Sequence, residues 1–597
     1  MSLKLRLSAL TIAILHTCSA NAATPTTMEN ITVTGDRFDT TPDQQLTVIN
    51  TIEREEIDRL SPKSVTELLG NLPGLSVTSN GGAGQSASVS IRGTNSKHTL
   101  VLIDGVRMAS ATTGEVSFGA ISPEMIERIE VVKGPRAAIW GSDAIGGVIQ
   151  IFTRQLKSGE WFASTEYGSS DYARGTAGVG ISHGDGSTSL TINKEKSDGI
   201  DVKDDAEEDK DGYHRFSLGV NGHQQLNHAW SLQWNGKLES GHYEYDSTRD
   251  NEADYDNYFA NVSSQYQGDK YTTKVLLGSA QDKNEHFRTD VDDAKRSLFQ
   301  TNRTQVNWSN RYLATDNITF IGGVDWANES IKGDYAVDSR DTTGAYALAR
   351  VNLGPVLLEG AVRYDDVENI DSETSYSTSA AYVFNDQWRL TGSYGTAFKA
   401  PSFNDLYYPS SGNPDLISET SKNLDVTLNY SGDDVQGYIS AFKNDVDNLI
   451  AWAPDAQGNW KPANVDKAEI QGIELSLSYD TWGIAHQLGY TYLDAVDASD
   501  DQQLKGRSEN EFDYQLGYTW SKVDLQLNYH YQGKRSNGND TFLDAYSKFD
   551  VSLGYKFADS WQLRLKGNNL TDQDLVSVNG YNAPGRQVFL SIGYQAF

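Results

Sequence analysis

Cysteine is almost absent from this sequence. The chain has one cysteine, Cys18, inside an N-terminal stretch that reads MSLKLRLSALTIAILHTCSANA over residues 1–22. Lys4 and Arg6 precede a short apolar core, and the small-x-small triplet ANA follows it, which predicts a secretory signal peptide cleaved before Ala23. The apolar core is too short for a membrane anchor. We therefore expect a mature chain without disulfides, thiolate metal sites or thiol nucleophiles.

Long hydrophobic runs and basic charge are also scarce. Beyond the signal peptide there is no run of about 18 apolar residues, which excludes a spanning helix. A secreted chain of this kind can still occupy a membrane if its strands close into a barrel. The 50 Lys and Arg against 81 Asp and Glu leave a net charge of −31. Since a polyanion binds to a basic face, nucleic acid is an unsuitable partner, whereas cations or the cell exterior fit.

The sequence after the signal peptide falls into two parts with different residue patterns. Residues 90–107 (SIRGTNSKHTLVLIDGVR) and 126–154 (IERIEVVKGPRAAIWGSDAIGGVIQIFTR) are glycine-punctuated, with β-branched runs long enough for strands buried on both faces. After about Gln155 the chain becomes a long series of alternating polar and apolar segments. A compact mixed domain in front of such a series predicts a plugged pore.

The alternating segments predict strands with one apolar and one polar face. Residues 523–532 (VDLQLNYHYQ) alternate strictly, and residues 376–384 and 561–566 repeat the pattern. The polar positions carry many charges and amides, which a small packed lumen could not satisfy, so the apolar face should point to lipid. Tyr and Trp are abundant and often lie near strand ends, as in interfacial girdles.

The size of this second part predicts a large barrel. At roughly 20 residues per strand and connection, it holds about 22 strands, the size associated with a plugged lumen. A secreted sandwich array or propeller is the soluble alternative, but no blade-length repeat is visible. The expected fold is an all-β transmembrane barrel of about 22 antiparallel strands with an N-terminal α+β plug inside the lumen.

Several phrases resemble the TonB-dependent outer-membrane receptors, and most closely the cobalamin-transporting members of that family. The plug phrases are NGGAGQ, IRGTNSKH, LVLIDGVR and GPRAAIWGSDAIGGVIQI, and the barrel phrases are YGTAFKAPSFNDLY, GNPDL, NNLTDQD and GYNAPGR. Ser418 departs from the family's usual proline. The resemblance implies TonB-energised import of cobalamin across the bacterial outer membrane, and it implies no catalysis.

The segment ENITVTG looks like the family's TonB box. It comprises Glu29, Asn30, Ile31, Thr32, Val33, Thr34 and Gly35. A short β-branched segment on a leader can add as a strand to a partner's sheet edge, although a plain edge strand of the plug is the alternative. We therefore expect a signal peptide over 1–22, a periplasmic leader over 23–40, the plug over 41–155 and the barrel over 156–597. TonB, cobalamin and outer-membrane lipid are the expected partners.

The resemblance also assigns a substrate site between the plug apices and the outer loops. The implied cobalamin contacts are Ser86, Ser88, Asn95, Thr113 and Gly114 of the plug and Ser247, Ser297 and Arg507 of the barrel. Ordinary loop polarity is the alternative, above all for the barrel residues. Arg92 and Arg136 are candidates to pair with barrel carboxylates such as Glu419, or are simply solvated.

Residues 199–213, GIDVKDDAEEDKDGY, form an acidic loop between two expected strands. The alternation in Asp209-Lys210-Asp211 is a spacing by which a turning loop aims carboxylates at one hard cation. Oxygen ligands without cysteine favour calcium over zinc. The resemblance matches a calcium site built from this loop and the next; its expected ligands are Asp201, Glu207, Asp209, Asp211, Tyr245, Asp246 and Asp254. A solvated acidic loop is the alternative.

Three other functions compete. A siderophore or haem receptor on the same scaffold would favour a basic or aromatic pocket or a histidine pair, whereas this chain has acidic outer loops and 10 histidines. A secreted enzyme would need a nucleophile and base, and no GxSxG motif, HExxH motif or Ser/His pair stands in a persuasive context. A passive porin would lack the plug and the coupling segment.

Overall fold

The computed structural model describes residues 33–41, 44–203, 207–288, 296–333, 335–454, 458–465, 467–499, 501–538 and 541–596. The predicted signal peptide and Glu29, Asn30, Ile31 and Thr32 of the expected TonB box lie outside these residues. Among the described residues, no helix is long and apolar enough to cross a membrane.

The N-terminal part folds around a five-stranded sheet in the order β1-β6-β7-β4-β5. Strands β4 and β7 are parallel, and the other neighbours are antiparallel. All five residues of β4 are buried, as the β-branched run predicts. The elements are β1 (Ile49–Glu53), α1 (Arg54–Leu60), α2 (Val65–Leu69), β2 (Leu75–Ser79), β3 (Ala87–Ile91), η2 (Ser96–His98), β4 (Thr99–Ile103), β5 (Val106–Arg107), η3 (Phe118–Ala120), η4 (Pro123–Met125), β6 (Ile126–Lys133), α3 (Ala137–Trp140) and β7 (Gly147–Thr153).

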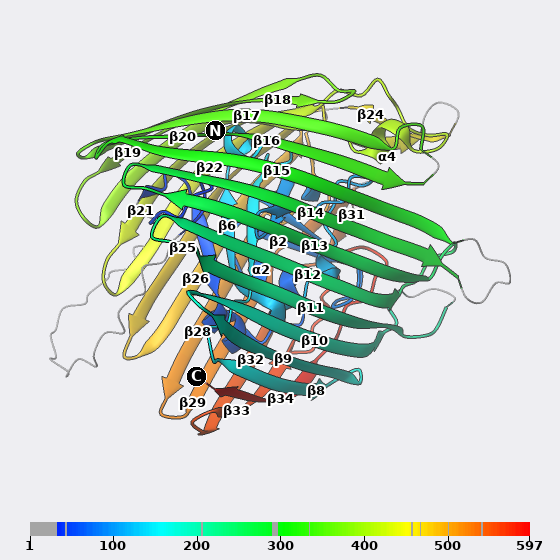
Figure 1. Cartoon of the computed structure of the whole chain (residues 1–597). Coiled ribbons are helices and arrows are strands. Elements are labelled where there is room, and N and C mark those ends of the chain that lie inside the picture. Colours follow the sequence, from blue (N-terminus) through cyan, green and yellow to red (C-terminus); the bar gives the residue numbers. More distant parts are fainter. Residues whose placement is uncertain are drawn as a thin grey trace, which may run out of the picture.

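The second part is a closed antiparallel barrel of 22 strands, as the alternation predicts. Strand β8 pairs with the last strand, β34, and so closes the wall around the N-terminal domain (Figure 1). The first eleven wall strands are β8 (Trp161–Gly168), β9 (Tyr172–His183), β10 (Gly186–Ile200), β11 (Asp211–Gln225), β12 (Trp230–Glu244), β13 (Glu252–Gln267), β14 (Tyr271–Phe287), β15 (Ser297–Thr315), β16 (Ile318–Lys332), β17 (Ser339–Leu353) and β18 (Val356–Val367).

The wall continues through eleven more strands. They are β19 (Glu373–Val383), β20 (Trp388–Lys399), β21 (Glu419–Ser431), β22 (Val435–Asp447), β25 (Ala468–Thr481), β26 (Ile484–Asp497), β28 (Asn510–Trp520), β29 (Val523–Gln532), β32 (Tyr546–Ala558), β33 (Trp561–Asn568) and β34 (Gln587–Ala596). Outer loops carry helix α4 (Phe403–Tyr407) and the short strands β23 (Ile450–Pro454), β24 (Trp460–Asn464), β27 (Gln502–Gln503), β30 (Arg535–Gly538) and β31 (Thr541–Leu543).

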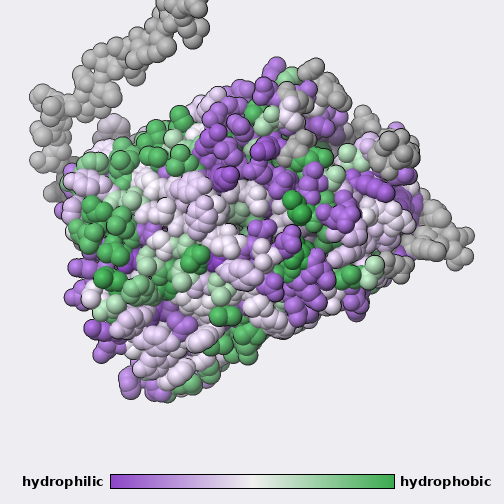
Figure 2. Space-filling model, turned by 90° about the horizontal axis from the view of Figure 1, so that it is seen from above, coloured by the Kyte–Doolittle hydropathy of each residue, from purple (hydrophilic) through white to green (hydrophobic). Residues whose placement is uncertain are grey.

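The two faces of the wall have opposite polarity. Outward-facing Leu238, Val262 and Leu277 are 56%, 50% and 55% exposed, whereas lumen-facing Glu239 and Asn261 are buried against the plug. A soluble barrel would reverse this order, because its apolar face fills the interior. A space-filling view of the wall shows apolar patches lying among hydrophilic residues (Figure 2). This arrangement suits a wall that faces lipid and a lumen that is wet.

The two ends of the barrel differ in the length of their connections. At one end the strands turn within a few residues, as at 184–185, 354–355 and 521–522; at the other lie long loops such as 400–418 (Figure 1). In outer-membrane barrels the short turns are periplasmic and the long loops extracellular.

Candidate functional site

The plug presents two apices to the outer loops. The first is the tip of the β2–β3 hairpin, where a Cβ on Gly84 would lie 2.3 Å from the ring of Tyr213. Gly84 also has a φ of +90°, so a side chain there would be strained as well as blocked. The second apex is residues 108–117, where the amide of Gly114 donates to Ser110 O at 2.8 Å. The glycine-rich text of the first apex thus permits close approach of the wall, as expected.

The implied substrate residues occupy both apices and the neighbouring loops. Ser86 is exposed, and Ser88 is half-buried on β3. Exposed Asn95 caps η2 by accepting from Lys97 N at 3.1 Å. Next to it, the Ser96 hydroxyl donates to Glu115 Oε1 at 3.4 Å, which brings Asn95 beside Thr113 and Gly114 of the second apex.

The implied barrel contacts divide into two groups. Arg249 of the loop after β12 donates to the Ser297 hydroxyl at 3.3 Å, and Ser247 accepts from Arg249 N at 3.4 Å, so Ser247 and Ser297 are linked. Arg507 instead donates to plug carbonyls, Gly93 O at 3.0 Å and Thr94 O at 2.9 Å. In this structure Arg507 therefore ties an outer loop to the plug, next to Asn95.

Three of the expected calcium ligands meet above the first apex. Asp201, Asp211 and Asp246 each offer one carboxylate oxygen, and these three oxygens lie within 4.8 Å of one another. Asp211 and Asp246 are buried. This cluster brings together the end of β10, the start of β11 and the loop after β12. Its oxygen donors are of the kind that suits a hard cation such as calcium.

The other four expected ligands have different partners or lie in solvent. Glu207 accepts from Asn251 Nδ2 at 2.8 Å, and the Tyr245 hydroxyl is hydrogen-bonded to His286 Nδ1 at 2.8 Å. Asp254 is hydrogen-bonded to His242 at 2.9 Å, and Asp209 is exposed. As calcium ligands these four stay predictions, as do Asp201, Asp211 and Asp246.

The described end of the expected TonB box is docked on the plug. Val33 is buried and exchanges two backbone hydrogen bonds with Thr40, at 2.8 and 3.0 Å. The amide and hydroxyl of Thr34 both donate to Glu130 Oε2 at 2.9 Å. The segment is thus ordered where it is described, so a partner could pair with it as a strand after these contacts break.

Arg37 fastens the same leader to the barrel. Its two terminal nitrogens donate to the two oxygens of Asp325 at 2.6 and 2.7 Å. One of them also donates to Ile139 O at 2.6 Å. A bidentate arginine–carboxylate pair is among the stronger polar contacts in proteins. Asp325 is not among the expected site residues, although a charged residue at a lumen-facing position of an alternating strand was a signal for it.

The expected arginine pairs form, but with other partners than Glu419. Arg92 donates through Nε to Glu474 at 3.0 Å and also pairs with Asp425, and Arg136 lies 3.7 Å from Glu359. The naming of Glu419 was wrong for both arginines, since His98 of the plug takes that carboxylate. Partner choice depends on which strands pass each plug residue, and these lie hundreds of positions away in sequence.

Glu474 is the centre of a buried charge cluster that the sequence analysis did not name. Besides Arg92, it accepts from Lys133 Nζ and from the Tyr438 hydroxyl. Burial lowers the pKa of Lys133 to about 8, with Glu474 opposing the shift. Removing one partner of such a cluster leaves a buried charge uncompensated, so it should anchor this side of the plug.

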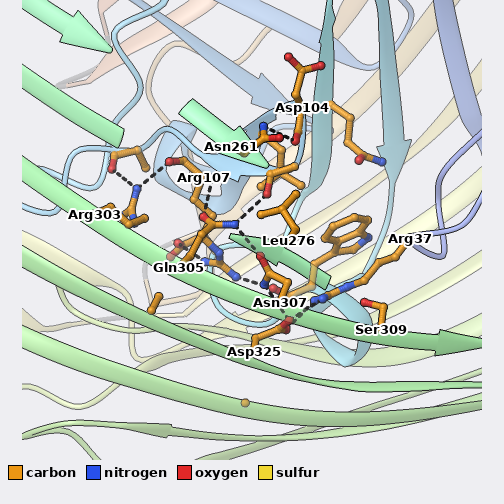
Figure 3. Close-up of a pocket in the computed structure, with 18 of the residues that line it drawn as sticks. Arg37, Asp104, Arg107, Asn261, Leu276, Arg303, Gln305, Asn307, Ser309 and Asp325 are labelled. Carbon is orange, nitrogen blue, oxygen red and sulfur yellow. Dashed lines mark hydrogen bonds and ion pairs between the residues drawn. The ribbon is translucent and has the colours of Figure 1, made fainter. Parts of the chain in front are cut away.

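On the other side of the plug, a polar cavity of about 500 Å³ lies against the wall. Its lining includes Ser110 and Gly114 of the second apex and Thr34 and Arg37 of the leader. Figure 3 shows Arg303, Gln305, Asn307 and Ser309 of β15 along one edge of it. The cavity therefore reaches from the substrate-facing end of the plug to its leader.

Two family models match the chain. Residues 160–570 match "TonB dependent receptor-like, beta-barrel", and residues 41–148 match "TonB-dependent Receptor Plug Domain". The chain belongs to the TonB-dependent receptors. It is accordingly a transporter of the bacterial outer membrane, in a family that depends on TonB.

Relatives and solved structures extend this assignment. The chain is 35% identical to the vitamin B12 transporter BtuB of Photobacterium profundum over 590 residues, or 96% of both chains. It is 32% identical over 606 residues to BtuB of Vibrio cholerae, covering 98% of this chain and 97% of that one. A mutant ferric enterobactin receptor PfeA from Pseudomonas aeruginosa superposes with a TM-score of 0.82 at 18% identity, covering 93% of this chain and all of that one. The FrpB iron transporter from Neisseria meningitidis gives 0.80 at 14%, over 92% and 99%. At these identities the two structures support the fold alone.

Proposed function

We propose that this TonB-dependent receptor imports cobalamin, with calcium ordering its outer loops. The observation that carries the proposal is the position of the carboxylate cluster. It joins two outer loops above the plug apex, where Gln85 Nε2 donates to Glu244 O at 2.8 Å and so connects the apex to the same wall. The relatives named vitamin B12 transporters, matched along nearly the whole chain, support the choice of ligand.

The ligand would lie on the two plug apices, under the outer loops. Ser86, Ser88 and Asn95 would contact it from the first side and Thr113 and Gly114 from the second. A neutral, polar surface of this kind suits a large ligand that carries many amides. From the wall, Ser247, Ser297 and Arg507 would complete the site, and Arg507 would exchange a plug carbonyl for the ligand or hold the apex in place beneath it.

Calcium would be held by Asp201, Asp211 and Asp246, with Asp209, Glu207, Tyr245 and Asp254 as further candidates within the same loops. A bound divalent cation neutralises carboxylates that repel one another when they are close. Its role would be structural. It would fix the segments that carry Asp201, Asp211 and Asp246 over the apex and so preform the ligand site. Outside the cell a weak affinity suffices.

Import also needs work from another compartment, because this chain has no nucleotide-binding loop and the outer membrane supplies no steep gradient. The TonB box of the leader, from Glu29 through Gly35, would receive that work by pairing as a strand with TonB. Pulling it would break the bonds of Val33 to Thr40 and of Arg37 to Asp325 before the plug itself moves.

Equilibrium binding of cobalamin to the purified protein, with calcium and with excess chelator, tests the proposal. A ferric siderophore serves as the competing ligand class. We expect cobalamin to bind and chelator to weaken it, and the Asp211→Asn/Asp246→Asn variant to bind weakly with or without calcium.

Asp256→Asn is the matched control for the cluster, because Asp256 is an exposed carboxylate on β13 that pairs with Lys283 at 3.4 Å and is not a candidate ligand. It should keep the calcium response of the wild type. Binding of the siderophore instead of cobalamin would reject the proposed ligand. Cobalamin affinity that is equal in calcium and in chelator would reject the proposed metal.

A further inference from the structure

One strand of the wall carries a continuous polar track along the cavity. On β15, lumen-facing Thr301, Arg303, Gln305 and Asn307 follow one another from the extracellular side toward the periplasm. Of these, Arg303, Gln305 and Asn307 line the cavity (Figure 3). The track faces the plug segment 104–114, which contains the β4–β5 turn and most of the second apex. A track of this kind can contact either the plug or water and polar solutes.

The plug segment is held to this track by hydrogen bonds with its backbone, two each made by Arg303 and Gln305. Thr301 accepts from Ala111 N at 3.0 Å, and Arg303 donates to Ala109 O at 3.0 Å. Gln305 donates to Gly105 O at 2.9 Å. Because the cavity beside them is polar, water or a ligand amide can replace each bond as it breaks.

The opposite wall holds the plug differently. There, Lys133 and Arg92 share Glu474 in a fully buried cluster, and Lys63 pairs with buried Glu166. Breaking such contacts leaves buried charges without a partner, so they resist separation more than bonds beside a wet cavity. The plug is therefore easier to part from β15 than from β25 and β8.

The leader contacts a plug residue, Trp140, that supports the side of the plug facing β15. Trp140 Nε1 donates to Gly35 O at 3.3 Å, and the guanidinium of Arg37 lies 4.8 Å from the Trp140 ring. The carbonyl of the same tryptophan accepts from Arg107, within the plug segment that faces β15. Removing the leader thus takes away two contacts of Trp140, and with them part of the support for Arg107.

We propose that the polar cavity along β15 is the import route, and that plug segment 104–114 leaves the wall to widen it while the Glu474 side stays in place. The inference rests on the proposed function as far as cobalamin is the passenger. A cavity of about 500 Å³ is too small for a corrinoid, so plug segment 104–114 must move. The polar track would then exchange its hydrogen bonds to the plug for bonds to the passing ligand.

Two engineered disulfides, in a background with Cys18 replaced by Ser, test which side opens. Ala111→Cys with Thr301→Cys closes the β15 side, where the amide and hydroxyl are 3.0 Å apart. Ser79→Cys with Ser577→Cys closes the other side through a contact of the same type, at 2.9 Å. Cobalamin binding to cells and its uptake are measured before and after reduction.

We expect the oxidised 111–301 pair to bind cobalamin but to import it at least about tenfold more slowly, with recovery on reduction, and the oxidised 79–577 pair to import normally. Normal import by the oxidised 111–301 pair would overturn the route. Loss of import by both pairs would also overturn it, because the plug would then leave as one unit.

Hydrogen exchange on the purified protein tests the same idea without any ligand. In Arg37→Ala, amides in segment 104–114 should exchange about tenfold faster than in the wild type, whereas those of β3 should not change. Uniform or absent acceleration would overturn the proposal. If the wild type fails to bind cobalamin, the proposed ligand is wrong, and this measurement still decides whether the β15 side opens.

Discussion

Asp104, at the turn between β4 and β5, links the stability of the plug to pH. Its φ is +47°, and its carboxylate accepts from the amide of Thr153 at 3.1 Å and from the same residue's hydroxyl. Burial raises its pKa to about 6, while the Thr153 hydrogen bonds oppose the shift. The native plug therefore keeps this proton to a higher pH than the unfolded chain does.

The sign of the pH effect follows from that difference. The stability linked to Asp104 is full below the unfolded pKa of 3.8 and is lost as the pH rises through about 6. Asp104→Asn cannot ionise, and asparagine tolerates a positive φ, so it should remove about 1–3 kcal/mol of this pH dependence. Denaturant unfolding of the plug at pH 4 and pH 7.5 measures it; equal pH dependence in both proteins would contradict the assignment.

Residue identity alone did not predict the partners of the charged plug residues. The motif around Arg92 made a barrel carboxylate a reasonable expectation, but Asp425 and Glu474 meet it rather than Glu419. His98, which the sequence analysis left without a role, occupies Glu419. The reason is geometric: a lumen presents many carboxylates, and the orientation of the plug inside it selects among them.

At the scale of elements, the leader is the part whose state the sequence could not show. Its composition indicates a segment able to pair with a partner, and the structure adds that Val33 is already paired with Thr40. Docking of this kind keeps the leader from pairing at random, because its strand bonds are satisfied until something pulls. A segment that a partner pulls and a plain edge strand of the plug have the same composition, so the sequence does not distinguish them.

Val33→Pro should abolish uptake and leave ligand binding within about twofold of the wild type, because proline removes the backbone donor needed by a strand. The same amide donates to Thr40 in the docked leader, so the leader should also become more sensitive to protease. Val33→Ala keeps the donor and is the matched control; it should retain uptake. Uptake by Val33→Pro at the wild-type rate would show that this segment does not receive the pull.

For the acidic loops, unlike the leader, the sequence predicted part of the observed arrangement. Spacing and resemblance named seven ligands, and three of them come together, from three separate parts of the chain. Which carboxylates meet depends on how the segments that carry Asp201, Asp211 and Asp246 lie against one another. For Glu207 and Asp254, nearby Asn251 and His242 compete successfully as partners.

The whole molecule is organised by the opposite polarity of the two faces of its wall. Val262 on β13 and Leu277 on β14 are cross-strand neighbours that point outward, whereas Gln265 lines the polar cavity inside. The same strand thus meets lipid on one side and a wet lumen on the other. Stability of the barrel should therefore depend on the face that a substitution alters and not only on its size.

Val262→Arg should destabilise the barrel in lipid vesicles by about 2 kcal/mol, because it places a charge against the hydrocarbon. Gln265→Arg, on the same strand but facing the cavity, should cost much less. Urea titration of folding into vesicles measures both. Equal losses would show that the two residues do not face lipid and lumen.

The sequence by itself determined the class of the molecule. The features that determined it are local: period-two alternation, the scarcity of cysteine and of long apolar runs, and the glycine-rich phrases. Each can be recognised without knowing any contact between distant residues. Tertiary structure alone decided that the leader is docked, that Glu474 anchors one side of the plug and that a polar cavity runs along β15 on the other. Those features depend on residues hundreds of positions apart, and only the closure of the barrel around the plug places them side by side.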